Sequence, residues 1–153
     1  MKRILVDGYS LLHNWPALAP GKLRHSEEAR QELIHILTLY HDATGIPVTI
    51  VFDGAGKTPA TAFPSTPEVE ILFSRAGQTA DQIIERVAFR MKPFGEALVV
   101  TDDHAERDTA AYQDALCSSC ANFIQTVERA LQDQQRDITR HNRKQNSGFK
   151  APP

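Results

Sequence analysis

The sequence predicts an α/β protein in which two helical layers enclose a central, mostly parallel sheet of about five strands, an α/β/α arrangement. Three observations favour this class. Short apolar runs of strand length alternate with longer segments whose apolar residues recur at helical spacing. The connections between most of them are short. Several of the apolar runs also end in an aspartate, which is typical of a shared site at one edge of a parallel sheet.

The first half of the chain alternates strand, helix and strand. Residues 4–6 are apolar, rich in β-branched side chains and too few for a helix, so they predict a buried strand. A short helix follows over 9–15. Ser26 is a preferred N-cap for a longer helix that Gly45 ends. Residues 47–52 then predict the second strand.

A loop rich in Gly, Pro, Thr and Ala is predicted over 54–67. It contains Gly56-Lys57-Thr58, which partly matches a phosphate-binding P-loop. That motif requires a glycine five positions before Gly56, where Val51 lies within a strand, so we expect no nucleotide cofactor. Lys57 is kept as a candidate contact to substrate phosphate, with a solvated loop lysine as the alternative.

The second half repeats the alternation. Residues 69–73 predict a third strand, and Thr79 with Gln82 forms a capping box that begins a helix ending before Pro93. A fourth strand is expected over 97–101. A short last strand over 115–117 precedes a final amphipathic helix that extends to Leu131.

Composition indicates one globular domain. The chain has 153 residues, of which 41% are hydrophobic and 24% charged. No apolar run is long enough to span a membrane, and Met1 to Arg3 lead directly into a strand instead of a signal peptide, so we expect a cytoplasmic protein without a membrane partner. Cys117 and Cys120 have CxxC spacing, but without a second pair or a nearby His they are a weak metal motif.

Charge divides the chain unevenly. From Arg136 onward there are five basic residues and one acid, a charge of +4, which leaves −6 for the rest of a chain whose total is −2. An acidic body argues against a large nucleic-acid groove there, but not against a metal site. Because the apolar period ends near Gln134, we expect a domain over residues 1–134 and a basic, disordered tail over 135–153.

Carboxylates gather where the predicted strands end and helices begin. Strand ends supply some of them, the first turn of the helix after the third strand supplies another, and one lies a turn further along that helix. These acids are Asp7, Asp53, Asp102, Asp103, Asp81 and Glu85. Unpaired carboxylates so close together would raise one another's pKa values. Oxygen ligands without His or Cys suit Mg²⁺ or Mn²⁺, which binds substrate phosphate in many enzymes.

Three of these acids also have a purely structural explanation. Asp7 can cap the helix that follows it. Asp81 can compensate a helix dipole, and Glu85 can be a solvated partner of a nearby base. Two adjacent acids after one strand, Asp102 and Asp103, are harder to explain by capping alone.

Four blocks of the sequence resemble the YacP-like branch of NYN domains, within the PIN-like nuclease superfamily. They lie between residues 2 and 131 and read Ile4-Leu5-Val6-Asp7-Gly8-Tyr9-Ser10, Val51-Phe52-Asp53-Gly54, Thr79-Ala80-Asp81-Gln82-Ile83-Ile84-Glu85-Arg86 and Val99-Val100-Thr101-Asp102-Asp103. The resemblance implies a PIN-like sheet with the first strand between the second and fourth, and metal-dependent endoribonuclease activity. It also implies that Asp7, Asp81 and Asp103 bind the metal, with Asp53 and Glu85 in support.

Three positions depart from the family pattern. Ser10 stands where the family usually has Asn, and we expect it to orient a ligand or water. Asp102 replaces the usual Ser and adds an acid to the metal site. His104 occupies a place commonly held by Arg, and with Arg86 and Lys57 it is a candidate RNA contact.

The expected reaction is hydrolysis of an RNA phosphodiester by a water bound to Mg²⁺ or Mn²⁺. Single-stranded RNA is the expected substrate, with the ribosome as a further partner of the basic tail. Tyr9, Trp15 and Phe63 are candidates for stacking on a base, with packing in the core or in a loop as the more common alternative for each. The alternative is a module of this fold that binds RNA or a ribosomal partner without cutting. An aspartyl-phosphate enzyme is disfavoured because Asp7 lacks a second acid two residues later.

Overall fold

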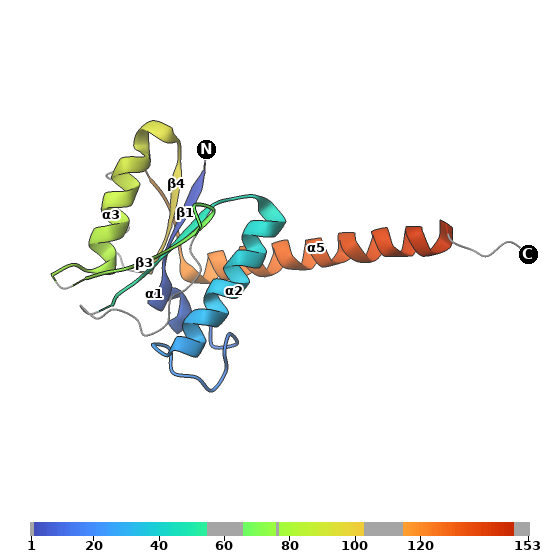
Figure 1. Cartoon of the computed structure of the whole chain (residues 1–153), viewed down its shortest axis with the longest axis horizontal. Coiled ribbons are helices and arrows are strands. Elements are labelled where there is room, and N and C mark those ends of the chain that lie inside the picture. The colour runs from blue at the N-terminus through green and yellow to red at the C-terminus, as the bar shows by residue number, and fades with distance from the viewer. Residues whose placement is uncertain (1, 55–65, 76, 103–114, 149–153) are drawn as a thin grey trace, which may run out of the picture.

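The computed structural model describes residues 2–54, 66–75, 77–102 and 115–148 (Figure 1). Its helices and strands follow the order predicted from the sequence. In chain order they are β1 (Arg3–Asp7), α1 (Gly8–His13), α2 (Glu27–Thr44), β2 (Val48–Phe52), β3 (Val69–Phe73), α3 (Ala80–Met91), the 3₁₀ helix η1 (Lys92–Phe94), β4 (Ala97–Val100), β5 (Leu116–Ser118) and α5 (Cys120–Gly148).

The five strands form one parallel sheet in the order β3-β2-β1-β4-β5. The predicted fold class is thereby confirmed, as is the placing of β1 between β2 and β4. In the register of the sheet, Val6 lies beside Ile50 on one side and Val100 on the other. Residues 53–68 connect β2 to β3 and residues 101–115 connect β4 to β5, so even the shortest strand-to-strand connections reach the dozen or so residues that a crossover between parallel neighbours requires.

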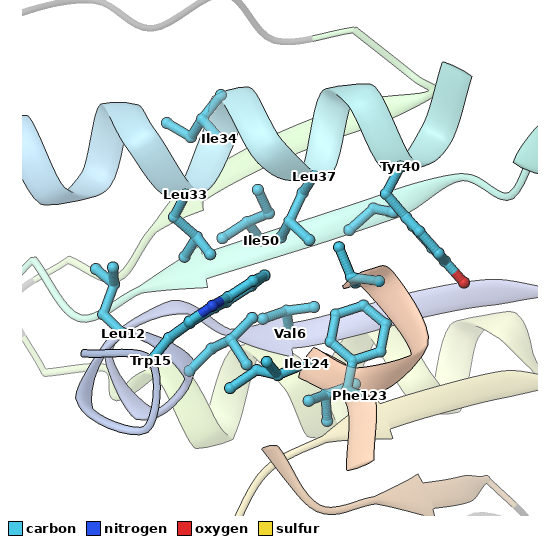
Figure 2. Packing of buried hydrophobic residues seen from close by; sticks show 14 of the residues in the cluster. Val6, Leu12, Trp15, Leu33, Ile34, Leu37, Tyr40, Ile50, Phe123 and Ile124 are labelled. Carbon is cyan, nitrogen blue, oxygen red and sulfur yellow. The ribbon is translucent and has the colours of Figure 1, made fainter. Parts of the chain in front are cut away.

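Each face of the sheet has its own hydrophobic core. Ile4, Val6 and Ile50 point to the face covered by α1, α2 and α5 (Figure 2), while Leu5 and Val51 point to the face covered by α3. Both faces of the central strands are therefore buried, which explains why they read as continuous apolar runs. Helices on both faces complete the predicted α/β/α layers (Figure 1).

Local sequence signals account for the helix ends. The Ser26 hydroxyl accepts a hydrogen bond from the backbone N–H of Ala29, and Gly45 ends α2 with a left-handed φ of 74°. Thr79 and Gln82 form the predicted capping box of α3. These caps satisfy N–H and C=O groups that a helix cannot pair within itself.

The segment between α1 and α2 is held by one guanidinium. Arg24 donates hydrogen bonds to five backbone carbonyls, and the shortest are to Leu18 at 2.8 Å and Ala19 at 2.6 Å. Nη1 is shared among three of the carbonyls and Nη2 between the other two, so the planar guanidinium reaches all of them at once. The irregular segment is therefore ordered by a side chain that the sequence pattern did not single out.

The C-terminal segment corrects a prediction. Where the sequence predicts disorder from residue 135, α5 continues as helix to Gly148 and projects from the body (Figure 1). Apolar contact with the body ends near Leu131, which is why the apolar period disappears there. Gln and Arg are nevertheless good helix formers, so the helix persists without a core beneath it. Among the described helices, none is long and apolar enough to cross a membrane.

Candidate functional site

The candidate site lies at the carboxyl edge of the sheet. Asp7 is the last residue of β1, and Asp53 and Asp102 follow the ends of β2 and β4. Asp81 lies in the first turn of α3, and its negative charge is close enough to raise the pKa of Asp7. The topology thus brings acids from four separate parts of the sequence to one edge, as the sequence predicts.

Asp7 caps a helix, and its carboxylate is also largely removed from solvent. Its carboxylate oxygen Oδ1 accepts a hydrogen bond of 3.3 Å from the backbone N–H of Ser10, so Asp7 caps α1. Burial nevertheless raises the pKa of Asp7 above its usual value, hydrogen bonds from Ser10 oppose that increase, and Asp81 adds to it. Capping explains the position of Asp7, but none of the groups that shift its pKa carries a positive charge to offset the burial of the carboxylate.

Ser10 acts on the carboxylate itself. Both its backbone N–H and its hydroxyl form hydrogen bonds that lower the pKa of Asp7. The predicted orienting role of Ser10 is therefore directed at Asp7 in this structure. A side chain longer than serine is not needed for that contact.

Gly8 allows α1 to begin directly beside β2. A Cβ atom added at Gly8 would lie 2.4 Å from Cε1 of Phe52, a separation at which something must shift. Phe52 is fully buried and its ring stacks on Phe73 at a centroid distance of 5.4 Å. The glycine after Asp7 is therefore a packing requirement of the edge that carries the acids.

Asp53 is connected to the neighbouring strand through a buried serine. The Ser74 hydroxyl donates to Asp53 Oδ1 at 3.0 Å and accepts from the backbone N–H of Gly54 at 3.0 Å. Ser74 is 1% exposed. Sequence reasoning missed Ser74, although a serine directly after the apolar run of β3 repeats the pattern of a polar residue at a strand end.

Asp102 pairs the first N–H of α5. Its Oδ1 accepts a hydrogen bond of 3.0 Å from the backbone N–H of Cys120, the first residue of that helix. The N-cap is Ser119, whose hydroxyl accepts from the backbone N–H of Asn122 at 3.1 Å. Asp102 therefore has a structural role at the start of α5, and its neighbour Asp103 lies outside the described residues. Cys120 is buried and Cys117 is exposed.

Several predicted site residues lie outside the described part of the chain. These are Lys57, Phe63, Asp103 and His104. Among the residues that are described, no three His, Cys, Asp or Glu side chains form a group able to hold a metal ion. Of the three predicted metal ligands, Asp7 and Asp81 are therefore described, and Asp103 is not.

Glu85 and Arg86 lie on the exposed side of α3. Together with Gln82 and Phe89 they line an open pocket of about 260 Å³. Phe89 is 59% exposed, so this part of the helix presents an aromatic ring beside an acid and a base.

The aromatic candidates separate into different environments. Trp15 is 4% exposed within the core, so the prediction that it could stack on a base was wrong (Figure 2). Tyr9 is partly buried, with its ring centroid 5.2 Å from Phe52 and 4.4 Å from His25. His25 is exposed, and its ring contact with Tyr9 was not predicted, because no spacing in the sequence connects His25 to the first strand.

The residues present fit a hard divalent cation. Asp7 and Asp81 supply oxygen donors, and their mutual repulsion together with the burial of Asp7 is what a bound cation would offset. The fit comes from the donor chemistry and the raised pKa of Asp7.

Comparison with known proteins agrees with this geometry. A model of the YacP-like NYN domain family matches residues 4–152. "Uncharacterized protein YacP" from Bacillus subtilis (strain 168) is 32% identical over 143 residues, which span 91% of this chain and 84% of YacP. The crystal structure of Rae1 (YacP) from Bacillus subtilis has a TM-score of 0.81 at 30% identity, covering 97% of this chain and 86% of Rae1. The crystal structure of a single-substitution mutant of Rae1 has a TM-score of 0.76 at 32% sequence identity, with the same coverage of both chains.

Fold and sequence together define a protein of the PIN-like nuclease kind. The chain belongs to the YacP-like NYN domain family, as its four sequence blocks predicted. This family has a nuclease-like function related to RNA, and nucleases of this kind generally use divalent metals. The family match continues beyond residue 134, where the sequence alone places the end of the domain.

Proposed function

We propose that this protein is a metal-dependent endoribonuclease that hydrolyses phosphodiester bonds of single-stranded RNA with Mg²⁺ or Mn²⁺. The observation that carries the proposal is the state of Asp7. A half-buried carboxylate with a raised pKa lies beside a second acid, Asp81, at the edge of a parallel sheet where ligands bind. A structural cap gains nothing from a neighbouring acid, whereas a cation site requires one.

In this proposal Asp7, Asp81 and Asp103 hold the metal. When bound, the ion lowers the pKa of a water and offsets charge on the phosphate. Asp53 and Glu85 support the site in the proposal, and Asp102 contributes a further carboxylate near it. The hydrogen bonds from Ser10 keep Asp7 oriented and favour its ionised, ligating form.

Substrate contacts in the proposal come from three basic side chains. Lys57, Arg86 and His104 would meet phosphates of the RNA strand, and Arg86 lies one position after Glu85 on the exposed side of α3. Messenger RNA or ribosome-associated RNA in the cytoplasm is the proposed substrate. No nucleotide cofactor or membrane takes part.

A second candidate function has one observation in its favour. Asp53 and Asp102 both form structural hydrogen bonds, the first with Ser74 and the second with Cys120. If those acids serve only the fold, fewer carboxylates remain for a metal. A module that binds RNA or the ribosome without cutting is therefore the alternative.

Cleavage of a labelled, mixed-sequence single-stranded RNA in Mg²⁺, Mn²⁺ or EDTA separates the two. Wild type should cut only with metal, and Asp7→Asn and Asp81→Asn should each lose more than about 100-fold in rate. Asp42→Asn removes an exposed acid on α2 and serves as the matched control, which should retain wild-type activity. Cutting that survives in Asp7→Asn and Asp81→Asn contradicts the proposed site, and metal-independent RNA binding without cutting supports the alternative.

A further inference from the structure

We propose that α5 is an RNA-binding arm that holds the phosphate backbone through a stripe of four arginines, which begins beside the body at Arg129 and continues along the projecting part of the helix. The arginine stripe consists of Arg129, Arg136, Arg140 and Arg143. The inference takes RNA as partner from the proposed function, but it concerns binding on a surface remote from the acids and does not require cleavage.

Helix geometry places these arginines on one face. At 3.6 residues per turn, Arg129, Arg136, Arg140 and Arg143 fall within an arc of about 60° and extend over about 21 Å of helix. All four are exposed. They lie on the side of α5 opposite the residues that pack on the body, of which Phe123 and Val127 are buried.

The projecting part of the arm has no core to explain it. Leu131 is the last apolar side chain of α5 that packs against the body, and the helix continues for about 25 Å beyond it at 1.5 Å per residue (Figure 1). A polar helix that leaves its domain buries nothing that would compensate for its ordering, so a partner is the physical reason to retain it.

Charge decides the kind of partner. Asp133 and Asp137 border the stripe on one side, and Asp133 lies 3.9 Å from Arg136 in an exposed pair that contributes little. From residue 138 to Gly148 the sequence contains no acid, so every charged side chain there is basic. The acidic body would repel a polyanion, and the arm is where the chain offers attraction to one.

Compensation of the helix dipole does not account for the stripe. That effect is confined to the last turn of a helix. Arg129 and Arg136 lie several turns before Gly148 and cannot contribute to it. Guanidinium groups that share one face of a helix are suited to binding phosphates along a strand.

The arm is joined to the candidate site at its base. The first residue of α5, Cys120, donates its backbone N–H to Asp102 at the acidic edge. Arg143 lies about 35 Å along the helix from that point. An RNA bound by the arm is thus held by the same rigid helix that begins at the site.

The test is a salt titration of RNA affinity, made in EDTA and in the Asp7→Asn background so that no cleavage occurs. It compares Arg136→Gln/Arg140→Gln with Gln135→Glu/Asn142→Asp, which changes the net charge equally but on another face of the helix. Both keep good or acceptable helix formers, and circular dichroism verifies the fold. The probe is an unstructured single-stranded RNA, with a pentanucleotide of the same composition as a short reference.

We expect the arginine variant to weaken binding of the long RNA and to reduce the slope of log affinity against log salt by about 1.4, since each phosphate contact contributes about 0.7 for single strands. The charge-matched control should change the slope by much less, and the pentanucleotide should be affected less than the long RNA. Equal effects of the two variants would overturn the inference, because RNA affinity would then depend on the net charge of the protein and not on the arginine stripe.

Two further outcomes would also overturn it. One is wild-type affinity and salt slope in the arginine variant. The other is a dimer in solution that Ile138→Gln dissociates while RNA affinity is unchanged, since Ile138 lies on the opposite face and is 47% exposed; this would assign the arm to a protein partner. Because this binding test involves no cleavage, its result does not depend on whether the protein is a nuclease. Failure of the proposed function can therefore be distinguished from failure of this inference.

Discussion

The carboxylate of Asp102 accepts a hydrogen bond of 3.0 Å from the backbone N–H of Cys120, joining the end of β4 to the start of α5. One residue therefore belongs both to the acidic edge and to the base of the projecting helix. The position of this helix depends on an acid that the sequence analysis assigned to metal binding.

Replacement of Asp102 separates these two roles. Asp102→Ala leaves the first N–H of α5 without its acceptor and should cost about 1 kcal/mol in the free energy of unfolding, a decrease of roughly 2–4 °C in Tm. Asp102→Asn keeps Oδ1 at the same position without the charge, so it should retain the Tm. If RNA cleavage is also retained in Asp102→Asn, the acid serves the fold; a decrease in cleavage at unchanged Tm would assign it to the metal site.

Replacement of Asp7 should show an effect of pH on stability. Because the pKa of Asp7 is raised above its usual 3.8, its ionised form is unfavourable in the folded protein. The resulting loss of stability develops as pH rises from 3.8 through the folded pKa, and it is absent below 3.8. Metal-free Asp7→Asn should therefore have a higher Tm than wild type at pH 7.

The difference in Tm between these proteins should shrink as the pH falls toward 4. Thermal unfolding in EDTA at several pH values measures it, with Asp42→Asn as control. A large decrease in Tm for Asp7→Asn at pH 7 would instead show that capping of α1 is the main role of Asp7.

Gly8→Ala should destabilise the protein through a clash with Phe52. The added Cβ would lie 2.4 Å from the ring, and overpacking of this kind costs about 1–3 kcal/mol. Phe52→Leu should lose stability by itself but should accept Gly8→Ala with less additional cost. A double-mutant cycle in denaturant measures this coupling, and additive effects would contradict a direct contact.

Ser74→Ala should change the orientation of Asp53, because the Ser74 hydroxyl donates a hydrogen bond to the Asp53 carboxylate. It removes the donor to Asp53 and the acceptor for the Gly54 N–H, which should cost about 1–3 kcal/mol in stability. If Asp53 supports the metal, cleavage should require more Mn²⁺ for half-maximal rate in Ser74→Ala and Asp53→Asn alike, and the double variant should be no worse than either. Unchanged Mn²⁺ dependence in both would leave Asp53 with a structural role.

Much of the fold follows from periodicity. Apolar runs such as Ile4 to Val6 and Val48 to Phe52 are buried on both faces, so they could be recognised from sequence alone. The length of α5 could not, because apolar spacing reports contact with a core and ends where the helix leaves the body. Helix propensity without burial is a weaker sequence pattern.

The candidate site could be predicted from the sequence only in part. Acids at strand ends converge because parallel topology requires it, so Asp7 and Asp81 could be paired in advance. The contacts of Ser74 and His25 depend on which strands and loops become neighbours, and no local spacing encodes that. The structural role of Asp102 depends on a helix that begins eighteen residues later in the chain.

Binding of Mn²⁺ tests the central claim most directly, and it can be followed by the loss of the free-ion signal in electron paramagnetic resonance. Wild type and Asp42→Asn should bind Mn²⁺ saturably with equal affinity, while Asp7→Asn and Asp81→Asn should each weaken binding by about 10-fold or more. Equal binding by wild type, Asp7→Asn and Asp81→Asn would contradict the account, because the acidic edge would then hold no ion.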